Sequence, residues 1–348
     1  MIGTRLTRRR LSARVRRAAT VIVAGVTLYV VLPATVHVVA AWPRLASLQL
    51  WWLAVAIASQ VVSFTCTLAL LRVVLHRPSW FAVVTAGLAG NAVTNTLPGG
   101  DAVGAGVQYR MLSRAGVRPA EAAGGLAASA IIGVAGLFIL PVFALPAIVG
   151  GSVNSGLEHA AILGLVGFVL IVALSVVLLA SDRALAILAR ALQWLVHLVR
   201  RRAPRGDLVA RSLAQRDELR ADLGRSWWRA VLLIGGRIGF DYGSLLAALR
   251  ATGDRANPSL VLLAYAATAV VALVPLTPGG IGIVEASLSG LLVLAGVPAA
   301  RAVLATLAYR VGSYWLPIGA GGVAYTSFRR RYGSVGEETT SDGAAPST

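Results

Sequence analysis

The sequence contains one motif twice, as PGGDAVGAGVQYRMLSRAGVRPAEA at residues 98–122 and as PGGIGIVEASLSGLLVLAGVPAARA at residues 278–302. Nine of these 25 positions are identical without a gap. Each copy interrupts a hydrophobic stretch with Pro-Gly-Gly, in which proline lacks a backbone donor and glycine permits positive φ. Such interruptions at membrane depth survive only against protein or a water-filled cavity. Matching interruptions in two halves of a chain indicate a transporter-type binding site.

The composition predicts an all-α, polytopic integral membrane protein. Of 348 residues, 57% are hydrophobic and 13% are charged, and the mean hydropathy is +0.76. Apolar runs close to the ~20 residues that cross a bilayer recur along the chain. The expected full spans are residues 18–41, 50–73, 119–149, 158–181, 229–250 and 299–327. Shorter apolar pieces flank the two motifs, at 80–97 and 102–114 and at 258–275 and 281–296.

The arginines predict the orientation of these spans. All 32 basic residues are arginine, and they concentrate in a basic N-terminus (1–17), a linker (182–228) and a tail (328–348). Cytoplasmic segments carry such an excess. We therefore expect a multi-pass protein of the cytoplasmic membrane with both termini in the cytoplasm, and a transmembrane domain at 18–327.

The same rule predicts two re-entrant hairpins. Segment 80–118 must enter and leave from the cytoplasmic side, and segment 258–297 from the outside. The repeat units are then 50–149 and 229–327, which lie in opposite orientations as an inverted repeat of six full spans plus two hairpins. A rival topology, in which every piece crosses the membrane, stays open.

Several classes of partner and cofactor are disfavoured by composition. The net charge of +18 lies between hydrophobic runs and fits anionic lipid headgroups better than nucleic acid. Cys66 is the single cysteine and the four histidines are scattered, so no metal site and no cofactor are expected. The amphipathic stretch at 183–201 predicts a helix on the inner leaflet, or one that packs on the cytoplasmic ends of the spans.

The hairpin tips are the first candidate binding site. Helices that begin near Ala102 and Gly282 would point unsatisfied N–H groups and partial positive charge at the tips, an arrangement that suits phosphate or carboxylate. The alternative is that the tips only let the two hairpins pack closely. The tip residues are Pro98, Gly99, Gly100, Pro278, Gly279 and Gly280.

Charges at membrane depth are the second candidate, because they are costly there and mark functional sites. Asp101 and Glu285 follow the two tips. Arg310 lies within the last span, where it could bind a lipid phosphate while Glu285 pairs with it or accepts a proton. Further polar side chains could line the same cavity or form helix–helix hydrogen bonds; they are Asn91, Thr94, Asn95, Gln108, Tyr109 and Tyr314.

Arg237 and Asp241 are four positions apart and therefore share one face of their helix. They are expected either to form an intramembrane ion pair or to act as functional groups.

Three stretches resemble the flippase-like membrane domain of the lysylphosphatidylglycerol synthase/flippase family. They are NTLPGGD at 95–101 with YRML at 109–112, PGGIGIVE at 278–285, and Tyr309-Arg310 with YWLP at 314–317. The resemblance covers roughly residues 18–327. It implies a multi-span domain that moves a phospholipid or another lipid-linked headgroup between leaflets, and it implies substrate contacts for Arg110, Glu285 and Arg310.

The sequence departs from that family in two places. Founding members carry a soluble catalytic domain after the membrane part, whereas only the tail follows here, so no aminoacyl transfer is expected. The first tip continues as Asp101-Ala102-Val103-Gly104 instead of a more glycine-rich run, which alters the geometry expected there.

These observations predict a lipid flippase or transporter and not an enzyme. Its partners would be a membrane lipid and a separately encoded lipid-modifying enzyme. A Walker-type nucleotide loop needs a lysine, which the chain lacks, so ATP drive within it is not expected. Two other functions stay open: a membrane-embedded transferase on a lipid-linked substrate, and a non-transporting partner of an envelope-lipid enzyme that uses the linker 182–228 for contact.

Overall fold

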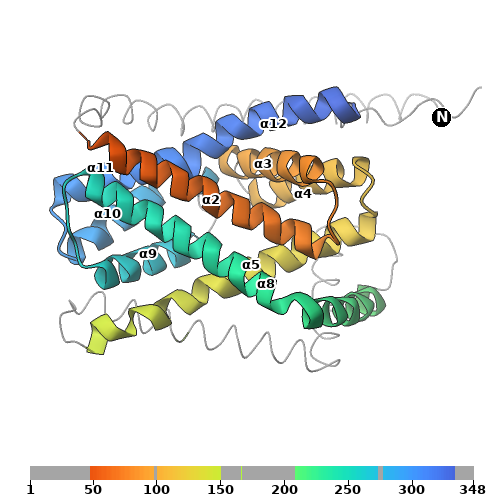
Figure 1. Ribbon diagram of the computed structural model, residues 1–348, viewed down its shortest axis with the longest axis horizontal. Coiled ribbons are helices and arrows are strands. Elements are labelled where there is room, and N and C mark those ends of the chain that lie inside the picture. The colour runs from red at the N-terminus through yellow and green to blue at the C-terminus, as the bar shows by residue number, and fades with distance from the viewer. Residues whose placement is uncertain (1–47, 98–99, 150–165, 167–207, 273–276, 334–348) are drawn as a thin grey trace, which may run out of the picture.

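The computed structural model describes residues 48–97, 100–149, 166, 208–272 and 277–333, and every regular element in these ranges is a helix (Figure 1). Among these described residues, three helices are long and apolar enough to cross a membrane, over Leu50–Val74, Pro119–Gly136 and Trp228–Ala251. Several expected features lie outside the described residues. They are the span 18–41, the span 158–181 apart from residue 166, the stretch 183–201, the N-terminus 1–17, most of the tail 328–348, and the tip residues Pro98 and Gly99.

The first half of the fold matches the expected pieces closely. It comprises α2 (Leu50–Val74), α3 (Trp80–Thr96), α4 (Gly100–Arg114) and α5 (Pro119–Val149). The hydroxyl of Ser79 caps α3 by accepting from the backbone N–H of Ala82. Helix α4 begins at Gly100 and not at 102, and its first turn contains Asp101, whose charge suits a helix N-terminus.

The second half differs from expectation in two places. It comprises α8 (Leu208–Ala251), α9 (Pro258–Ala272), a 3₁₀ turn (Pro278–Gly280), α10 (Ile283–Leu294), α11 (Ala299–Arg310), a π-helical turn (Val311–Trp315) and α12 (Leu316–Tyr332). Helix α8 begins 21 residues before the expected 229, because 208–228 has charges but no proline and is rich in helix-forming residues. The last expected span is divided by the π-helical turn.

The duplicated Ala-Gly-Val stretches fold alike. Gly116 has φ 94° and Gly296 has φ 91°. The N–H of Val117 bonds to Leu112 O at 3.1 Å, and that of Val297 bonds to Leu292 O at 3.0 Å. This is the left-handed glycine cap that ends a helix with a six-to-one hydrogen bond. The sequence repeat is therefore also a repeat of local structure.

The two halves pack on each other reciprocally. Helices α2 and α8, the first helices of the two repeat units, contact each other extensively. Helix α12 packs on α3, and α5 packs on α9 (Figure 1). The last helix of each unit thus lies on the first hairpin arm of the other unit, as expected for two copies related by an approximate two-fold axis.

Glycines allow the arms of the first hairpin to approach closely. A Cβ atom on Gly104 would lie 2.5 Å from the carbonyl oxygen of Gly90 and would also clash with the Thr94 hydroxyl. Backbone on the opposing helix cannot yield as a flexible side chain could. Small residues at such positions permit tight helix packing in membranes.

Replacing Gly104 by valine is therefore expected to lower the apparent melting temperature of the detergent-purified protein. Overpacking of this kind costs about 1–3 kcal/mol. Gly106→Val is the matched control, because Gly106 lies on the same helix and a Cβ there meets nothing within 4 Å. Equal melting temperatures for the two variants, measured by fluorescence-detected gel filtration after heating, would contradict the close packing.

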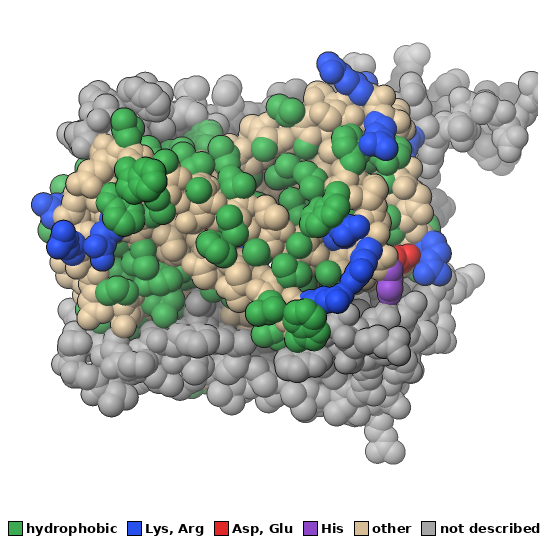
Figure 2. All heavy atoms as spheres, in the orientation of Figure 1, with side chains coloured by type: hydrophobic (Ala, Val, Ile, Leu, Met, Phe, Trp, Pro, Cys, Tyr) green, Lys and Arg blue, Asp and Glu red, His purple; other side chains and the backbone are tan. Residues whose placement is uncertain are grey.

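Apolar side chains cover much of the exterior. Trp51 is 74% exposed, Val323 67% and Leu232 64%. Figure 2 shows hydrophobic side chains across the middle of one face, with arginines gathered toward the left and right ends of the helices. A soluble protein would not tolerate such a surface, and it suits contact with lipid.

Candidate functional site

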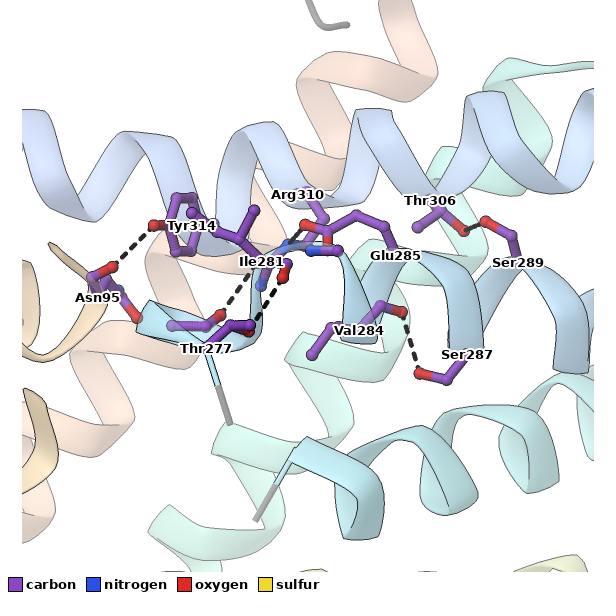
Figure 3. Close-up of polar contacts among 12 residues, drawn as sticks. Asn95, Thr277, Ile281, Val284, Glu285, Ser287, Ser289, Thr306, Arg310 and Tyr314 are labelled. Atoms are coloured by element: carbon purple, nitrogen blue, oxygen red, sulfur yellow. Dashed lines mark hydrogen bonds and ion pairs between the residues drawn. The ribbon is translucent and has the colours of Figure 1, made fainter. Parts of the chain in front are cut away.

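The tip of the second hairpin is a tight turn built from glycines. Gly279, Gly280 and Gly282 have φ of 56°, 71° and 83°, a region that other residues rarely adopt. The hydroxyl of Thr277 donates to the carbonyl of Ile281 at 2.9 Å and closes the turn (Figure 3). The backbone can therefore reverse within a few residues and begin α10 at Ile283.

Glu285 lies in the first turn of α10 and joins the tip to α11. Its Oε2 accepts from the backbone N–H of Gly282 at 2.6 Å, half of a capping box. Its Oε1 accepts from Nε of Arg310 at 2.6 Å. Nη2 of Arg310 donates to the carbonyl of Gly279 at 3.1 Å. One guanidinium thus holds both the carboxylate and the turned backbone (Figure 3).

The pair is buried on the Arg310 side. The Arg310 side chain is 10% exposed and the Glu285 side chain is 26% exposed. The guanidinium also lies over the ring of Tyr314, 4.4 Å from its centroid, a cation–π contact. These two hydrogen bonds use the Nε–H and one N–H of Nη2, and the guanidinium has three further N–H donors, two of them on Nη1.

The two hairpins meet at this point. The hydroxyl of Tyr314 donates to the carbonyl of Asn95 at 2.7 Å, near the end of α3 (Figure 3). A Cβ atom on Gly279 would lie 3.0 Å from the same carbonyl. The end of the first hairpin's first arm therefore touches the tip of the second, and Tyr314 bridges them.

A π-helical turn sets the spacing of Arg310 and Tyr314. The N–H of Leu316 bonds to the carbonyl of Val311, five residues back. Pro317 has no N–H, and its ring disfavours a regular α-helical turn before it. π-turns inside helices occur frequently at functional sites, and Pro317 within an apolar run was the sequence signal for this one.

Two expected site residues lie away from this cluster. Asp101 and Arg110 are exposed on α4. Neither forms an ion pair or side-chain hydrogen bond with a described residue. Gly100 packs against the Thr94 backbone and Pro278 is buried in the turn. Of the expected substrate contacts, the structure thus brings together Glu285, Arg310 and Tyr314.

The expected ion pair between Arg237 and Asp241 is not among the ion pairs within 4.0 Å that the described residues form. Asp241 instead accepts from neutral donors: Gln60 Nε2 at 3.0 Å, Tyr309 Oη at 3.0 Å and Tyr265 Oη at 2.5 Å. Sequence reasoning missed these three donors because they come from three other helices. Only the tertiary packing brings them to α8.

The Arg310 cluster presents hydrogen-bond donors and positive charge of the kind that suits an anion. No group of three histidine, cysteine, aspartate or glutamate side chains in the described part of the chain could hold a metal ion. A guanidinium presents donors in a planar fork that matches phosphate and carboxylate. The N-terminus of α10 adds partial positive charge beside it.

Comparison with known proteins agrees with this architecture. Residues 18–321 match the family model described as the lysylphosphatidylglycerol synthase TM region. The UPF0104 membrane protein PH1989 of Pyrococcus horikoshii is 38% identical over 78 residues, which is 22% of this chain and 23% of that protein. No solved structure matches the chain. The match over most of the sequence, with the apolar helices, shows that the chain is a membrane protein that belongs to the lysylphosphatidylglycerol synthase TM region family.

Proposed function

We propose that the protein moves a phospholipid, or another lipid with a phosphate-linked headgroup, between the leaflets of the cytoplasmic membrane without changing it chemically. The observation that carries this proposal is the buried Arg310–Glu285 pair at the point where the two hairpins meet. Broken helices around a charged site at the interface between repeats are typical of transporters.

The reciprocal packing of the two repeat units supports an inverted repeat. In this proposal the chain has six full spans and two re-entrant hairpins that approach from opposite faces. In this proposal the arginine-rich segments lie in the cytoplasm, and both termini lie there with them. Rocking of one unit against the other would then open the Arg310 site alternately to the two leaflets.

Glu285 acts as the partner that a lipid phosphate replaces. In the empty site its carboxylate neutralises Arg310, as in the 2.6 Å contact. When a phosphate approaches, the guanidinium can turn to it while Glu285 keeps the N–H of Gly282 and the N-terminus of α10. The lipid headgroup is thus held by charge-assisted hydrogen bonds and released when Glu285 returns.

The partners follow from the same chemistry. Anionic headgroups would contact the arginine-rich cytoplasmic segments, and a separately encoded enzyme would supply or consume the transported lipid.

The test is lipid movement in vesicles that contain only the purified protein. Fluorescently labelled phosphatidylglycerol and labelled glucosylceramide, which lacks a phosphate, are each placed in both leaflets, and a membrane-impermeant reductant then bleaches the outer label. We expect protein-dependent bleaching of the inner phosphatidylglycerol and little for glucosylceramide. Equal rates for both lipids, or no protein-dependent bleaching, would contradict the proposal.

A further inference from the structure

A pair of asparagines lies beside the point where the two hairpins meet, in the last turns of α3. Nδ2 of Asn95 donates to Oδ1 of Asn91 at 2.9 Å. The backbone carbonyl of Asn95 accepts from the hydroxyl of Tyr314 and so fixes this end of α3 at the tip of the second hairpin (Figure 3). The phosphate contacts proposed for Arg310 make no use of these two amide side chains.

Most of the hydrogen-bonding capacity of the two amides is unused. Each amide has a carbonyl oxygen and an NH₂ group, and the bond between them leaves Oδ1 of Asn95 and the NH₂ group of Asn91 without a partner among the described residues. Reversing both amides exchanges these roles but still leaves an oxygen and an NH₂ group free. Both side chains are half-buried. Because unpaired polar groups are costly at membrane depth, these groups indicate contact with a polar ligand.

The unpaired oxygen of Asn95 lies close to the groups that surround Arg310. A Cβ atom on Gly279 would lie 3.0 Å from Oδ1 of Asn95 and would clash with the ring of Tyr314, so the amide oxygen and the ring border the same side of Gly279. The carbonyl of Gly279 accepts from Arg310, whose guanidinium lies 4.4 Å from the centroid of the same ring. One aromatic ring and one glycine therefore separate the amide from the proposed phosphate-binding group.

The internal repeat shows that a hairpin of this kind does not need the two amides. At the offset of 180 residues that relates the two motifs, Asn91 and Asn95 correspond to Val271 and Pro275. The charged pair of the second unit likewise corresponds to alanines in the first unit. The two copies have thus diverged in chemistry: the first supplies neutral amides where the hairpins meet, and the second supplies the charges.

We propose that Asn91 and Asn95 bind hydroxyl groups of the headgroup whose phosphate Arg310 holds, so that the lipid substrate carries a polyol beyond its phosphate. A hydroxyl both donates and accepts, and it therefore matches an unpaired amide oxygen and an unpaired NH₂ group at once. An ammonium group only donates and would leave the NH₂ group unmatched, and a choline group does neither. This assignment rests on the proposed function, because it takes the phosphate to lie at Arg310.

The amides then determine which phospholipid binds, whereas Arg310 determines that a phosphate binds. A site built to hydrogen-bond a hydroxyl discriminates against an analogue that lacks it, because the polar groups of the site are left unpaired. Hydrogen bonds from the two neutral amides are expected to favour a hydroxylated headgroup by about tenfold or more.

The experiment compares two lipids that differ only in the hydroxyl groups of the headgroup. Phosphatidylglycerol and phosphatidylpropanol with identical acyl chains have the same charge and the same three-carbon headgroup, but phosphatidylpropanol lacks the hydroxyls. Each is titrated into the purified protein in detergent, and the melting temperature is measured, because a ligand that binds the folded state raises it. We expect an apparent affinity for phosphatidylglycerol that is about tenfold higher or more.

Asn91→Ala and Asn95→Ala should each reduce this preference without changing the affinity for phosphatidylpropanol. Asn95→Ala keeps the backbone carbonyl that Tyr314 uses, and unchanged binding of phosphatidylpropanol shows that a variant is folded. Thr85→Val is the matched control on the same helix. Its hydroxyl donates to the carbonyl of Phe81 within α3, so the preference of this variant should equal that of the wild-type protein.

The outcomes separate this proposal from the lipid-transport proposal. Equal affinities of the wild-type protein for the two lipids, no stabilisation by either lipid, or a preference that survives both alanine variants would overturn the polyol assignment, whether or not lipid moves in vesicles. A preference for phosphatidylglycerol that both variants lose would support the assignment. If no lipid then moved in vesicles, the headgroup site would stand and the transport function would be contradicted.

Discussion

Arg310→Ala is expected to abolish phosphate-dependent lipid movement in reconstituted vesicles. The guanidinium is the buried group that donates to Glu285 and to the tip carbonyl of Gly279. Loss of one partner of a buried, hydrogen-bonded charge pair costs about 2–5 kcal/mol. A barrier change in the middle of that range lowers the rate by roughly several hundredfold. The measurement is the initial rate of inner-leaflet bleaching of labelled phosphatidylglycerol at matched protein density.

Arg301→Ala is the matched control for this prediction. Arg301 lies on the same helix and pairs with Asp254 at 3.3 Å, but its side chain is 50% exposed. Arg301 lies nine positions before Arg310 and does not contact Glu285 or Gly279, so this variant should transport at nearly the wild-type rate. Arg310→Lys keeps the charge but loses the planar fork, and we expect an intermediate rate. A wild-type rate for Arg310→Ala would remove the guanidinium from the mechanism.

Gly279→Val is expected to disrupt the contact between the hairpins and to lose both thermal stability and lipid movement. A Cβ atom there would clash with the Tyr314 ring and would crowd the Asn95 carbonyl. The residue also has φ 56°, where a β-branched side chain is strongly disfavoured. The combined strain and overpacking amount to a few kcal/mol. The melting temperature in detergent measures the loss of stability, and the vesicle assay measures the loss of lipid movement.

Valine substitutions at two other glycines of the same hairpin distinguish the effect of backbone strain from the effect of side-chain clashes. Gly282 has φ 83° but a Cβ there meets nothing within 4 Å, and Gly290 has neither feature. Valine should therefore be tolerated at 290, should cost intermediate stability at 282 and should be most harmful at 279. A different order would show that the tip does not depend on close packing with Asn95 and Tyr314.

Much of the helical framework could be predicted from the sequence. The Pro-Gly-Gly motifs predicted the break before α10, and the repeated Ala-Gly-Val stretches have the same left-handed glycine turn. Helix α8 was expected to begin later, because the charges of 208–228 resemble those of a solvated linker. Charge separates lipid-facing from polar segments, but it does not end a helix.

The candidate site could be predicted only in part. Glu285 and Arg310 were recognisable because charges within apolar segments are rare. The contact between Tyr314 and Asn95 could not be recognised in the sequence, because its acceptor is a backbone carbonyl, which every residue has. The partners of Asp241 were missed because Gln60, Tyr265 and Tyr309 are ordinary residues until folding places them around one carboxylate. Arg110 carried suitable chemistry, but it lies on an exposed face of α4.

The central claim is that the two hairpins approach their meeting point from opposite sides of the membrane. Ala120 and Ala300 test it directly, because they are exposed, 180 positions apart and equivalent in the two copies. Each is replaced by cysteine in a Cys66→Ala background, and intact cells are treated with a membrane-impermeant maleimide before and after permeabilisation. Ala120→Cys should react only after permeabilisation and Ala300→Cys in intact cells. Reaction of both positions from the same side would contradict the account.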